Sequence, residues 1–236
     1  MKQGSVWNRN VCLIMLGFVL LTGGGLQAVE ARPVVIVPMQ LQQGSLISLK
    51  IPQLDSGMPG ESMAIFNEYY RQVVLQRLRE FEPVAYETRL VPQLPAAVKN
   101  ALVFMADYEV FRSDMTIVSL TQKIYQFTGG AHGMTWQTGH TIDLVSAQRL
   151  LLPDLFRTGS NYAERLNRFV REQGAAKNLP MWEYNGIGTD SAFYLNDDGI
   201  VLFFQPYEVA PYSEGIVRMM IPYRLVADIL RPEIFR

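Results

Sequence analysis

The stretch VKNALVFMADYEVFRSDMTIVSLTQKIYQF, residues 98–127, decides the fold class. In its first half, alternate side chains are mostly apolar, which is typical of a strand with one buried face. Ser113-Asp114 then predicts a short turn into a second strand that is rich in β-branched and aromatic residues. Residues 134–145, MTWQTGHTIDLV, continue as a third strand, with Gly139 as a bend or bulge. Three neighbouring strands of this kind predict an antiparallel meander.

Two segments outside the meander have helical periodicity. From Glu61 to Phe81, apolar residues recur at intervals of three and four, and Pro83 is expected to end this helix. A second helix is expected to begin at Ser160 or Asn161, either of which can cap it, and to run through Gln173. Each helix therefore has one apolar face that must be buried.

The remaining segments complete the order of elements. Residues 45–54 predict a strand, and residues 193–205, FYLNDDGIVLFFQ, predict a hairpin whose turn ends at Asp198-Gly199. Residues 215–222 predict a last strand, which leads into a short helix over residues 223–230. The order predicts an α+β fold: an antiparallel β-sheet meander with two main helices packed against one face, plus a short C-terminal helix.

The first 31 residues have the order of a secretory signal peptide. Lys2 and Arg9 precede an apolar run from Val11 to Leu21, and small residues follow. In a helix this run rises roughly 16 Å, about half the hydrocarbon thickness of a bilayer, so an uncleaved membrane anchor is the weaker alternative. We expect cleavage before Arg32, with cleavage after Ala28 as second choice. Residues 32–236 would then form one domain, periplasmic or secreted, with no stable membrane span.

Charge and cysteine content narrow the range of functions. The chain has a formal net charge of −1, and removal of residues 1–31 changes it to −2. A nearly neutral protein lacks the basic surface that nucleic acids require, so no nucleic-acid partner is expected. The one cysteine, Cys12, lies within the predicted signal. The mature protein is therefore expected to contain no disulfide, no thiol nucleophile and no thiolate metal ligand.

Both histidines of the chain lie in FTGGAHGMTWQTGHTID, residues 127–143. Gly129, Gly130 and Gly133 surround His132 between two predicted strands. Glycine is used where φ is positive or where another segment passes close by. The favoured interpretation is a structural turn that the His132 imidazole pins by a hydrogen bond to a carbonyl group.

The segment PYEVAPYSEG, residues 206–215, is the best candidate for ligand binding. Tyrosine offers a large contact area with a polar tip, and proline restricts a loop at low entropic cost. Buried tyrosines are also common, so a role in the core is the alternative. The binding residues that we expect are Tyr207, Tyr212, Pro206, Pro211 and His132.

Several of these motifs together resemble a known family. FTGGAHGMTWQTGHTIDL, LPDLF, FYLNDDGIVLFFQPYEVAPYSEG and MMIPYRLV are similar to the extracytoplasmic domain shared by RsiV-type anti-sigma factors, which sense lysozyme, and PdaC-type peptidoglycan deacetylases. The resemblance runs from about the KIPQL strand to the end of the chain. It implies an α+β recognition domain of the cell envelope whose partner is a lysozyme-like protein or a peptidoglycan fragment. Only ten residues precede the apolar run and no deacetylase domain follows, so a stand-alone domain without either parent activity is expected.

The expectation is therefore a non-catalytic recognition domain with no cofactor and no metal. Two alternatives stay open. An envelope hydrolase could use His132 with a carboxylate such as Asp143, although no G-x-S-x-G elbow supports Ser119 or Ser191 as a nucleophile. A structural subunit of an envelope assembly would instead expose an apolar patch and self-associate. His132, His140 and Asp143 match no common zinc spacing, and a turn explains the adjacent Asp197 and Asp198 without chemistry.

Overall fold

The computed structural model describes residues 34–235, and these fall within one compact unit. The predicted signal peptide, residues 1–31, lies outside the described residues. None of the helices in the described part combines the length and the apolar character that a membrane span needs.

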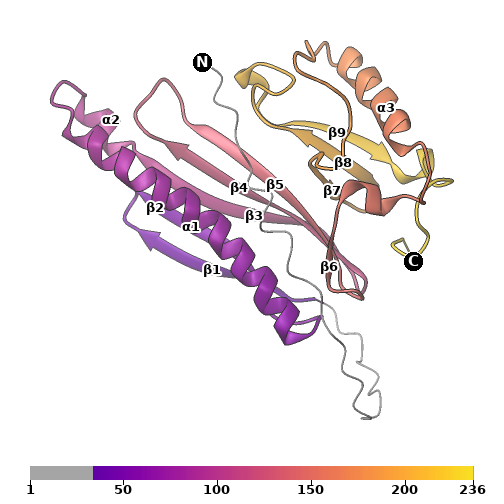
Figure 1. Ribbon diagram of the computed structural model, residues 1–236. Coiled ribbons are helices and arrows are strands. Elements are labelled where there is room, and N and C mark those ends of the chain that lie inside the picture. Colours follow the sequence, from indigo (N-terminus) through magenta and orange to yellow (C-terminus); the bar gives the residue numbers. More distant parts are fainter. Residues whose placement is uncertain (1–33, 236) are drawn as a thin grey trace. The chain divides into compact units, whose positions relative to one another are not determined.

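The larger sheet has six strands in the order of the chain (Figure 1). They are β1 (Ile36–Gln43), β2 (Ile47–Leu54), β3 (Val103–Ser113), β4 (Ile117–Phe127), β5 (Met134–Asp143) and β6 (Gln148–Leu150). β3, β4 and β5 pair antiparallel, which confirms the meander, and Asp114 N–H bonds the Ile117 carbonyl in the predicted turn. β2 and β3 pair parallel, because a helix crosses over the sheet between them.

That helix, α1 (Gly60–Leu90), packs on one face of the larger sheet (Figure 1). Its buried side chains are Tyr70, Val74, Phe81 and Ala85. The prediction that Pro83 ends the helix was wrong, since the helix continues for seven residues beyond it. Pro83 is exposed, while Phe81 and Ala85 on either side of it are buried against the sheet. Packing on both sides of the proline outweighs the hydrogen bond that it removes.

The chain reaches β3 through a short helix, α2 (Ala96–Asn100), which follows Pro95. The strand expected from residue 98 onward therefore begins later, at Val103. Proline is favoured just before a helix because its restricted φ suits the helix start.

A second sheet of three antiparallel strands forms the rest of the fold. β7 (Phe193–Leu195) pairs with β8 (Gly199–Phe204), and β8 pairs with β9 (Val217–Pro222). The helix α3 (Tyr162–Ala176) packs against β9. The α+β class is confirmed. The prediction that two helices pack on one face of a single sheet was wrong, because each sheet carries its own helix (Figure 1). Helical periodicity predicts a buried face without indicating which sheet buries it.

The ends of α3 and the C-terminal segment differ in detail from expectation. α3 follows Asn161, as predicted, although the Asn161 side chain makes no capping hydrogen bond. Gly174 lies within the helix, where an added Cβ would meet the Met181 sulfur at 2.7 Å. The expected helix over residues 223–230 is reduced to a single 3₁₀ turn, Tyr223–Leu225. Leu230 instead forms a β-bridge with Phe156, which draws the segment away from helical geometry.

The two sheets meet where β7 packs against β4 and β5. Ser119 Oγ accepts the Leu195 N–H at 2.8 Å and lies 2.8 Å from Thr141 Oγ1. Gly139 also permits this close approach, because a Cβ there would lie 2.0 Å from the Phe193 carbonyl oxygen. The expected bend or bulge at Gly139 was wrong: β4 and β5 pair without interruption, and the bulge lies in β3 between Val110 and Arg112.

Apolar side chains form two main cores. One lies between α1 and the larger sheet and includes Tyr70, Phe81 and Phe104. The other gathers residues from α3, the second sheet and the C-terminal segment, and it includes Ile117 of β4. Ile117 therefore connects the larger sheet to the core of the smaller one.

Candidate functional site

The loop between β4 and β5, residues 128–133, is shaped by two glycines. Gly129 has a φ of +94°, and a Cβ there would lie 2.9 Å from Thr88 Cγ2 at the end of α1. Thr88 Oγ1 also donates to the Thr128 carbonyl at 3.2 Å. At Gly133, a Cβ would lie 2.2 Å from the Tyr125 hydroxyl oxygen. Gly129 thus fits the loop against α1, and Gly133 fits it against β4. Gly130 has open space around it.

The second contributing loop follows β8 and contains PYEVAPYSEG. Glu208 accepts the Gln205 N–H at 2.7 Å and thereby closes a tight turn in which Tyr207 has a φ of +70°. A positive φ is rare for a residue with a Cβ, so the surroundings must hold Tyr207 in place. Pro206 is buried at the start of the loop. Pro211 directly precedes a 3₁₀ turn at Tyr212–Glu214.

Gln205 ties the base of this loop to β5. Its side-chain oxygen accepts the Gln137 N–H at 3.1 Å, and its side-chain nitrogen donates to the Gln137 carbonyl at 2.8 Å. The amide thus behaves like one more residue of a β-ladder. This clamp brings the two loops together. Gln205 is not among the binding residues expected from the sequence, because a glutamine in a loop carries no sequence signal of its own.

The two loops bring together His132, Tyr207 and Tyr212, which we call the aromatic triad. The His132 and Tyr212 rings stack with centroids 3.9 Å apart and planes inclined by 20°. The Tyr207 hydroxyl lies 3.2 Å from His132 Nε2, and the two tyrosine rings are 5.8 Å apart. Residues 75 positions apart in the chain therefore form one surface cluster.

Hydrogen bonds assign the polar groups of the aromatic triad. His132 Nδ1 lies 2.9 Å from the Gly133 carbonyl oxygen, which can only accept, so Nδ1 carries the proton in the neutral ring. Nε2 is then the acceptor for the Tyr207 hydroxyl. Tyr212 donates to the same Gly133 carbonyl at 2.8 Å. His132 hydrogen-bonds a carbonyl group of its own loop, and it also contacts the exposed Tyr207, which retains 46% of its accessible surface.

His132 and Asp143 do not form a catalytic pair. His132 precedes the first residue of β5 and Asp143 is its last residue, so the length of the strand, roughly 30 Å at about 3.4 Å per residue, separates them. Asp143 accepts hydrogen bonds from Val145 and Ser146 in the next turn. Across the described residues, no hydrogen bond or ion pair joins His132 to a carboxylate, and no group of three His, Cys, Asp or Glu side chains is placed to hold a metal ion.

The second histidine, His140, is buried between α1 and the larger sheet. Its ring makes edge contacts with Tyr69 and Tyr70, and its Nε2 lies 3.1 Å from Thr138 Oγ1. Burial lowers the pKa of His140 well below its usual value, and the charge of Arg149 acts in the same direction. His140 is therefore a neutral core residue that does not contact His132.

The weaker nucleophile and carboxylate candidates have structural roles. Ser119 is buried between the sheets, and Ser191 Oγ accepts the Gly188 N–H at 2.9 Å. Asp198 lies in the predicted turn, where Asn196 Oδ1 accepts the N–H groups of Asp198 and Gly199. A Cβ at Gly199 would lie 2.3 Å from the Ile221 carbonyl oxygen, so this glycine permits close pairing with β9.

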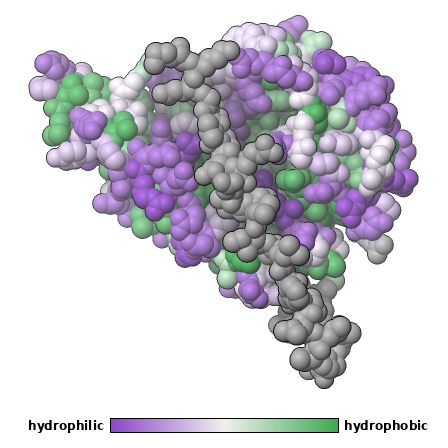
Figure 2. All heavy atoms as spheres, viewed as in Figure 1, coloured by the Kyte–Doolittle hydropathy of each residue, from purple (hydrophilic) through white to green (hydrophobic). Residues whose placement is uncertain are grey.

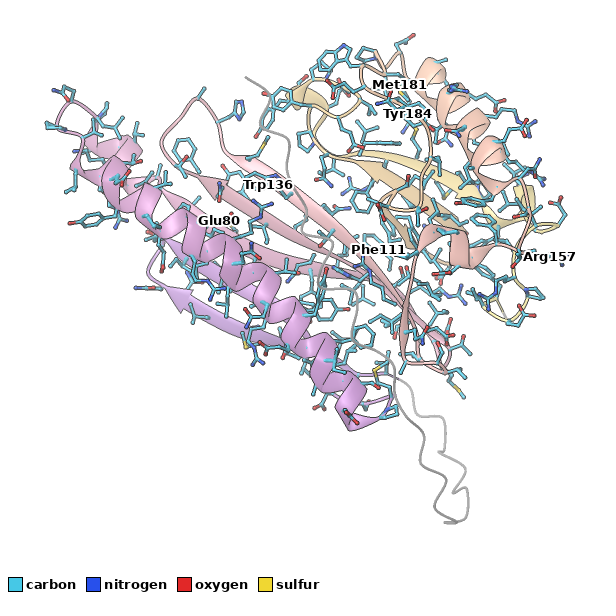
Figure 3. The ribbon with its side chains drawn as sticks, in the orientation of Figure 1. Glu80, Phe111, Trp136, Arg157, Met181 and Tyr184 are labelled. Atoms are coloured by element: carbon cyan, nitrogen blue, oxygen red, sulfur yellow. The ribbon has the colours of Figure 1, made fainter. Side chains whose placement is uncertain are left out.

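Three further aromatic residues lie apart from the aromatic triad. Trp136 is half-buried beside α1, with the Arg77 guanidinium 5.1 Å from its ring centroid (Figure 3). Trp182 is 55% exposed in the segment after α3. Nearby, Tyr184 bonds Asn167 with its hydroxyl at 2.5 Å, and burial raises the pKa of Tyr184 to about 12 (Figure 3).

Comparison with protein families places the two halves of this site in two matching regions. Residues 42–135 match the family model described as Deacetylase PdaC, and residues 153–224 match that described as Protein of unknown function (DUF3298). The chain is homologous to PdaC and RsiV. This confirms the resemblance noted from its motifs. His132 lies in the first matching region and both tyrosines of the aromatic triad lie in the second.

Three curated relatives illustrate the similarity. The peptidoglycan-N-acetylmuramic acid deacetylase PdaC of Bacillus subtilis is 26% identical over 67% of this chain and 34% of its own length. The anti-sigma-V factor RsiV of the same organism is 25% identical over 79% of this chain and 66% of its own length. An esterase of Mycobacterium tuberculosis is 26% identical over 44% of this chain and 48% of its own length. The chain thus spans about a third of PdaC and just under two thirds of RsiV.

Solved structures show the same fold. A DUF3298 family member from Bacteroides fragilis superposes with a TM-score of 0.65 at 18% identity, over 84% of this chain and 94% of that one. A second, from Pseudomonas aeruginosa, has a TM-score of 0.57 at 19% identity, over 85% and 94% of the two chains.

Proposed function

We propose that this protein is a non-catalytic recognition domain of the cell envelope that acts outside the cytoplasm and binds a lysozyme-like muramidase. One observation carries the proposal: two loops far apart in the sequence are clamped together so that the aromatic triad reaches the surface. Tyrosine and histidine side chains held by hydrogen bonds lose little entropy when a partner covers them. Such anchors are typical of protein interfaces.

The end of α1 adds apolar surface beside the same loop. Val84, Leu90 and Val91, which we call the apolar tip, are between 43% and 62% exposed. Figure 2 shows hydrophobic side chains gathered at this end of α1. The 128–133 loop rests on α1 through Gly129 and Thr88, so the apolar tip and the aromatic triad flank one loop. Apolar surface next to exposed tyrosine favours a protein partner over a glycan.

The relatives support an envelope role without supplying an activity. PdaC acts on peptidoglycan by its name, and RsiV is an anti-sigma factor by its name. The match covers only 34% of PdaC, so the deacetylase reaction is not part of the proposal. The esterase relative matches less than half of this chain, and neither serine candidate of the described residues contacts His132.

Calorimetric titration of the purified protein with hen lysozyme and, separately, with muropeptides tests the proposal. We expect heat of binding with lysozyme and at least a tenfold loss of affinity for Tyr207→Ala, about 1.4 kcal/mol or more. Tyr207→Phe keeps the ring but removes the bond to His132, so its loss should be smaller. Trp182→Ala, an exposed aromatic outside the triad, is the matched control and should bind normally.

Other outcomes of this experiment point elsewhere. Binding of muropeptides alone would assign the aromatic triad to peptidoglycan instead of a muramidase. Absence of heat with both ligands at high micromolar concentration would reject the proposal. Light scattering of the free protein tests the structural-subunit alternative, which requires self-association through a surface such as the apolar tip.

The proposed location depends on removal of the signal. Amino-terminal sequencing of the protein recovered from the envelope or the medium should begin at Arg32. Recovery of the protein from the cytoplasm with its initial methionine would contradict an extracytoplasmic role.

A further inference from the structure

We propose that a cavity beside the C-terminal segment binds a small zwitterion, either a free amino acid or a short peptide. The cavity has a volume of about 500 Å³, and its lining includes Arg112, Asp114, Arg157, Asp197, Tyr223 and Phe235. It shares no residue with the aromatic triad. Figure 3 shows Arg157 near the C-terminal segment and well away from Trp136. The inference is therefore independent of the function proposed above.

Arg112 and Asp114 line the cavity as a hydrogen-bonded pair. Arg112 Nε donates to Asp114 Oδ2 at 2.7 Å, and the guanidinium lies 5.7 Å from the centre of the Phe235 ring. Asp114 Oδ1 accepts from Thr116 and Ile117 in the turn between β3 and β4. Burial raises the pKa of Asp114, but these hydrogen bonds outweigh burial and keep it below its usual value. The pair is neutral as a whole and is committed to its own turn.

Two opposite charges that no ion pair engages line the cavity, although Arg157 also feels the charge of Asp228, which is not part of the lining. Arg157 Nε is held by the Leu230 carbonyl at 3.1 Å, and no hydrogen bond or ion pair within the described chain engages its two terminal nitrogens. Asp197 lies in the β7–β8 turn, but Asn196 makes the hydrogen bonds of that turn. Both charges line the cavity, yet no ion pair joins Arg157 to Asp197 within the described residues. Their charged atoms are therefore more than 4 Å apart, on the wall of one cavity.

The rest of the wall is apolar or aromatic. Tyr223 and Phe235 meet edge to face with centroids 4.9 Å apart, and Tyr223 donates its hydroxyl proton to the Asn196 carbonyl at 2.9 Å. Leu230 continues this surface. An apolar body could rest against these side chains while Arg157 bonds a carboxylate and Asp197 bonds an ammonium group.

The charge balance selects a zwitterion over a simple anion. A phosphate or dicarboxylate would gain Arg157 but would place a second negative charge near Asp197. Because like charges in a shared site repel, such ligands should be rejected. A ligand with one charge of each sign satisfies both rim residues.

Calorimetry or ligand-observed NMR with defined probes tests this inference. The probes are L-phenylalanine, D-alanyl-D-alanine, hydrocinnamate, which lacks the ammonium group, and phenethylamine, which lacks the carboxylate. We expect a zwitterion to bind at least tenfold more tightly than either singly charged analogue. A preference for L-phenylalanine would indicate a free amino acid, and a preference for the dipeptide would indicate a peptide of the cell wall.

Paired variants test the two rim residues. Asp197→Asn removes the partner of the ammonium group, so it should abolish the preference for L-phenylalanine over hydrocinnamate. Arg157→Met removes the partner of the carboxylate, so it should abolish the preference for L-phenylalanine over phenethylamine. The matched controls, Asp198→Asn and Arg224→Met, change exposed neighbours that do not line the cavity and should bind as the parent protein does. Thermal unfolding of each variant shows whether it is folded. The proposal would be overturned if no probe bound at about 10 mM. It would also be overturned if the parent protein bound the singly charged analogues as tightly as L-phenylalanine.

Discussion

Gly139 is a residue at which the two sheets come close together. The Phe193 carbonyl oxygen occupies the place where a side chain would begin. The Phe193 carbonyl belongs to the backbone of β7, which cannot rotate away as a side chain can. Position 139 therefore accepts only glycine unless β7 moves.

Gly139→Ala is therefore expected to lower the free energy of unfolding by about 2 to 4 kcal/mol. Chemical denaturation monitored by tryptophan fluorescence measures this change. Gly130→Ala is the matched control, because its Cβ would meet no atom within 4 Å, and it should change stability by less than about 0.5 kcal/mol. Equal effects of the two substitutions would contradict the close approach of the sheets.

His140 is a buried residue that makes stability depend on pH. Tyr69 and Tyr70 face it from α1, Thr138 faces it from its own strand, and Arg149 of β6 adds positive charge nearby. None of these groups stabilises an imidazolium ion. The pKa of His140 is consequently far lower in the folded protein than the value near 6.5 of an unfolded chain.

Between these two pKa values the unfolded chain binds more protons than the folded protein does. The contribution of His140 to stability is thus fully present above about pH 6.5 and is lost as the pH falls below it. Denaturation midpoints measured from pH 7.5 to 5 should decline, and His140→Gln should flatten that decline. His132→Gln changes the exposed histidine and should leave most of the decline in place. A decline that is unchanged in His140→Gln would contradict the role of His140.

At the scale of elements, α1 shows how tertiary contacts override a local signal. Pro83 has no N–H group to bond the Arg79 carbonyl, so the helix contains a break in its hydrogen-bond ladder. The helix persists because Phe81 and Ala85 continue its buried stripe. A residue-level signal for helix termination thus fails where packing continues on both sides of it.

Pro83→Ala is expected to raise the free energy of unfolding by about 1 to 3 kcal/mol, since it restores the missing donor at an exposed position. Thermal and chemical unfolding measure the gain. Glu82→Ala, at the preceding exposed position, controls for helix propensity and should have an effect within about 0.5 kcal/mol. A loss of stability in Pro83→Ala would mean that the proline fits a bend required by the sheet.

Strand prediction depended on how regular each pattern is. β3 and β4 alternate or are rich in β-branched residues, so their existence could be predicted. β1 could not, because most of its side chains are exposed on both faces and Pro38 interrupts it. β1 is a strand only because β2 pairs with it along its whole length. An edge strand held by one neighbour leaves little pattern in the sequence.

At the scale of the whole molecule, two cores share one larger sheet. The face toward α1 is mainly apolar, while the face toward the second sheet carries the buried polar residues Ser119, Thr121 and Thr141. Ile117 extends from β4 into the second core. Because hydrogen bonds join the two sheets and Ile117 of the larger sheet packs in the second core, we expect the domain to unfold as one unit.

Phe81→Ala in the first core and Leu166→Ala in the second test this expectation. Each should destabilise the protein by about 2 to 5 kcal/mol and shift a single cooperative transition. Calorimetry and amide hydrogen exchange together detect separate unfolding. Two resolved transitions, with each variant lowering only its own, would show that the sheets are independent domains.

Several features were determined by the sequence alone: the α+β class, the three-stranded meander, the start of α3 and the turn at Asp198-Gly199. The residues of the aromatic triad could also be singled out, since glycines around a histidine and tyrosines between prolines are local patterns. These features depend on neighbours along the chain, where periodicity and turn chemistry act. Their meeting could not be predicted, because no local pattern relates His132 to residues about 75 positions away.

Only the tertiary structure decided the parallel pairing of β2 with β3, the separation into two sheets and the position of the aromatic triad. It also decided that Arg157 and Asp197 line a common cavity without pairing. Periodicity indicates that a face is buried but not which surface buries it. That choice depends on the shape of both surfaces, such as the space that Gly139 leaves for the Phe193 carbonyl group, and shape of this kind exists only after the chain has folded.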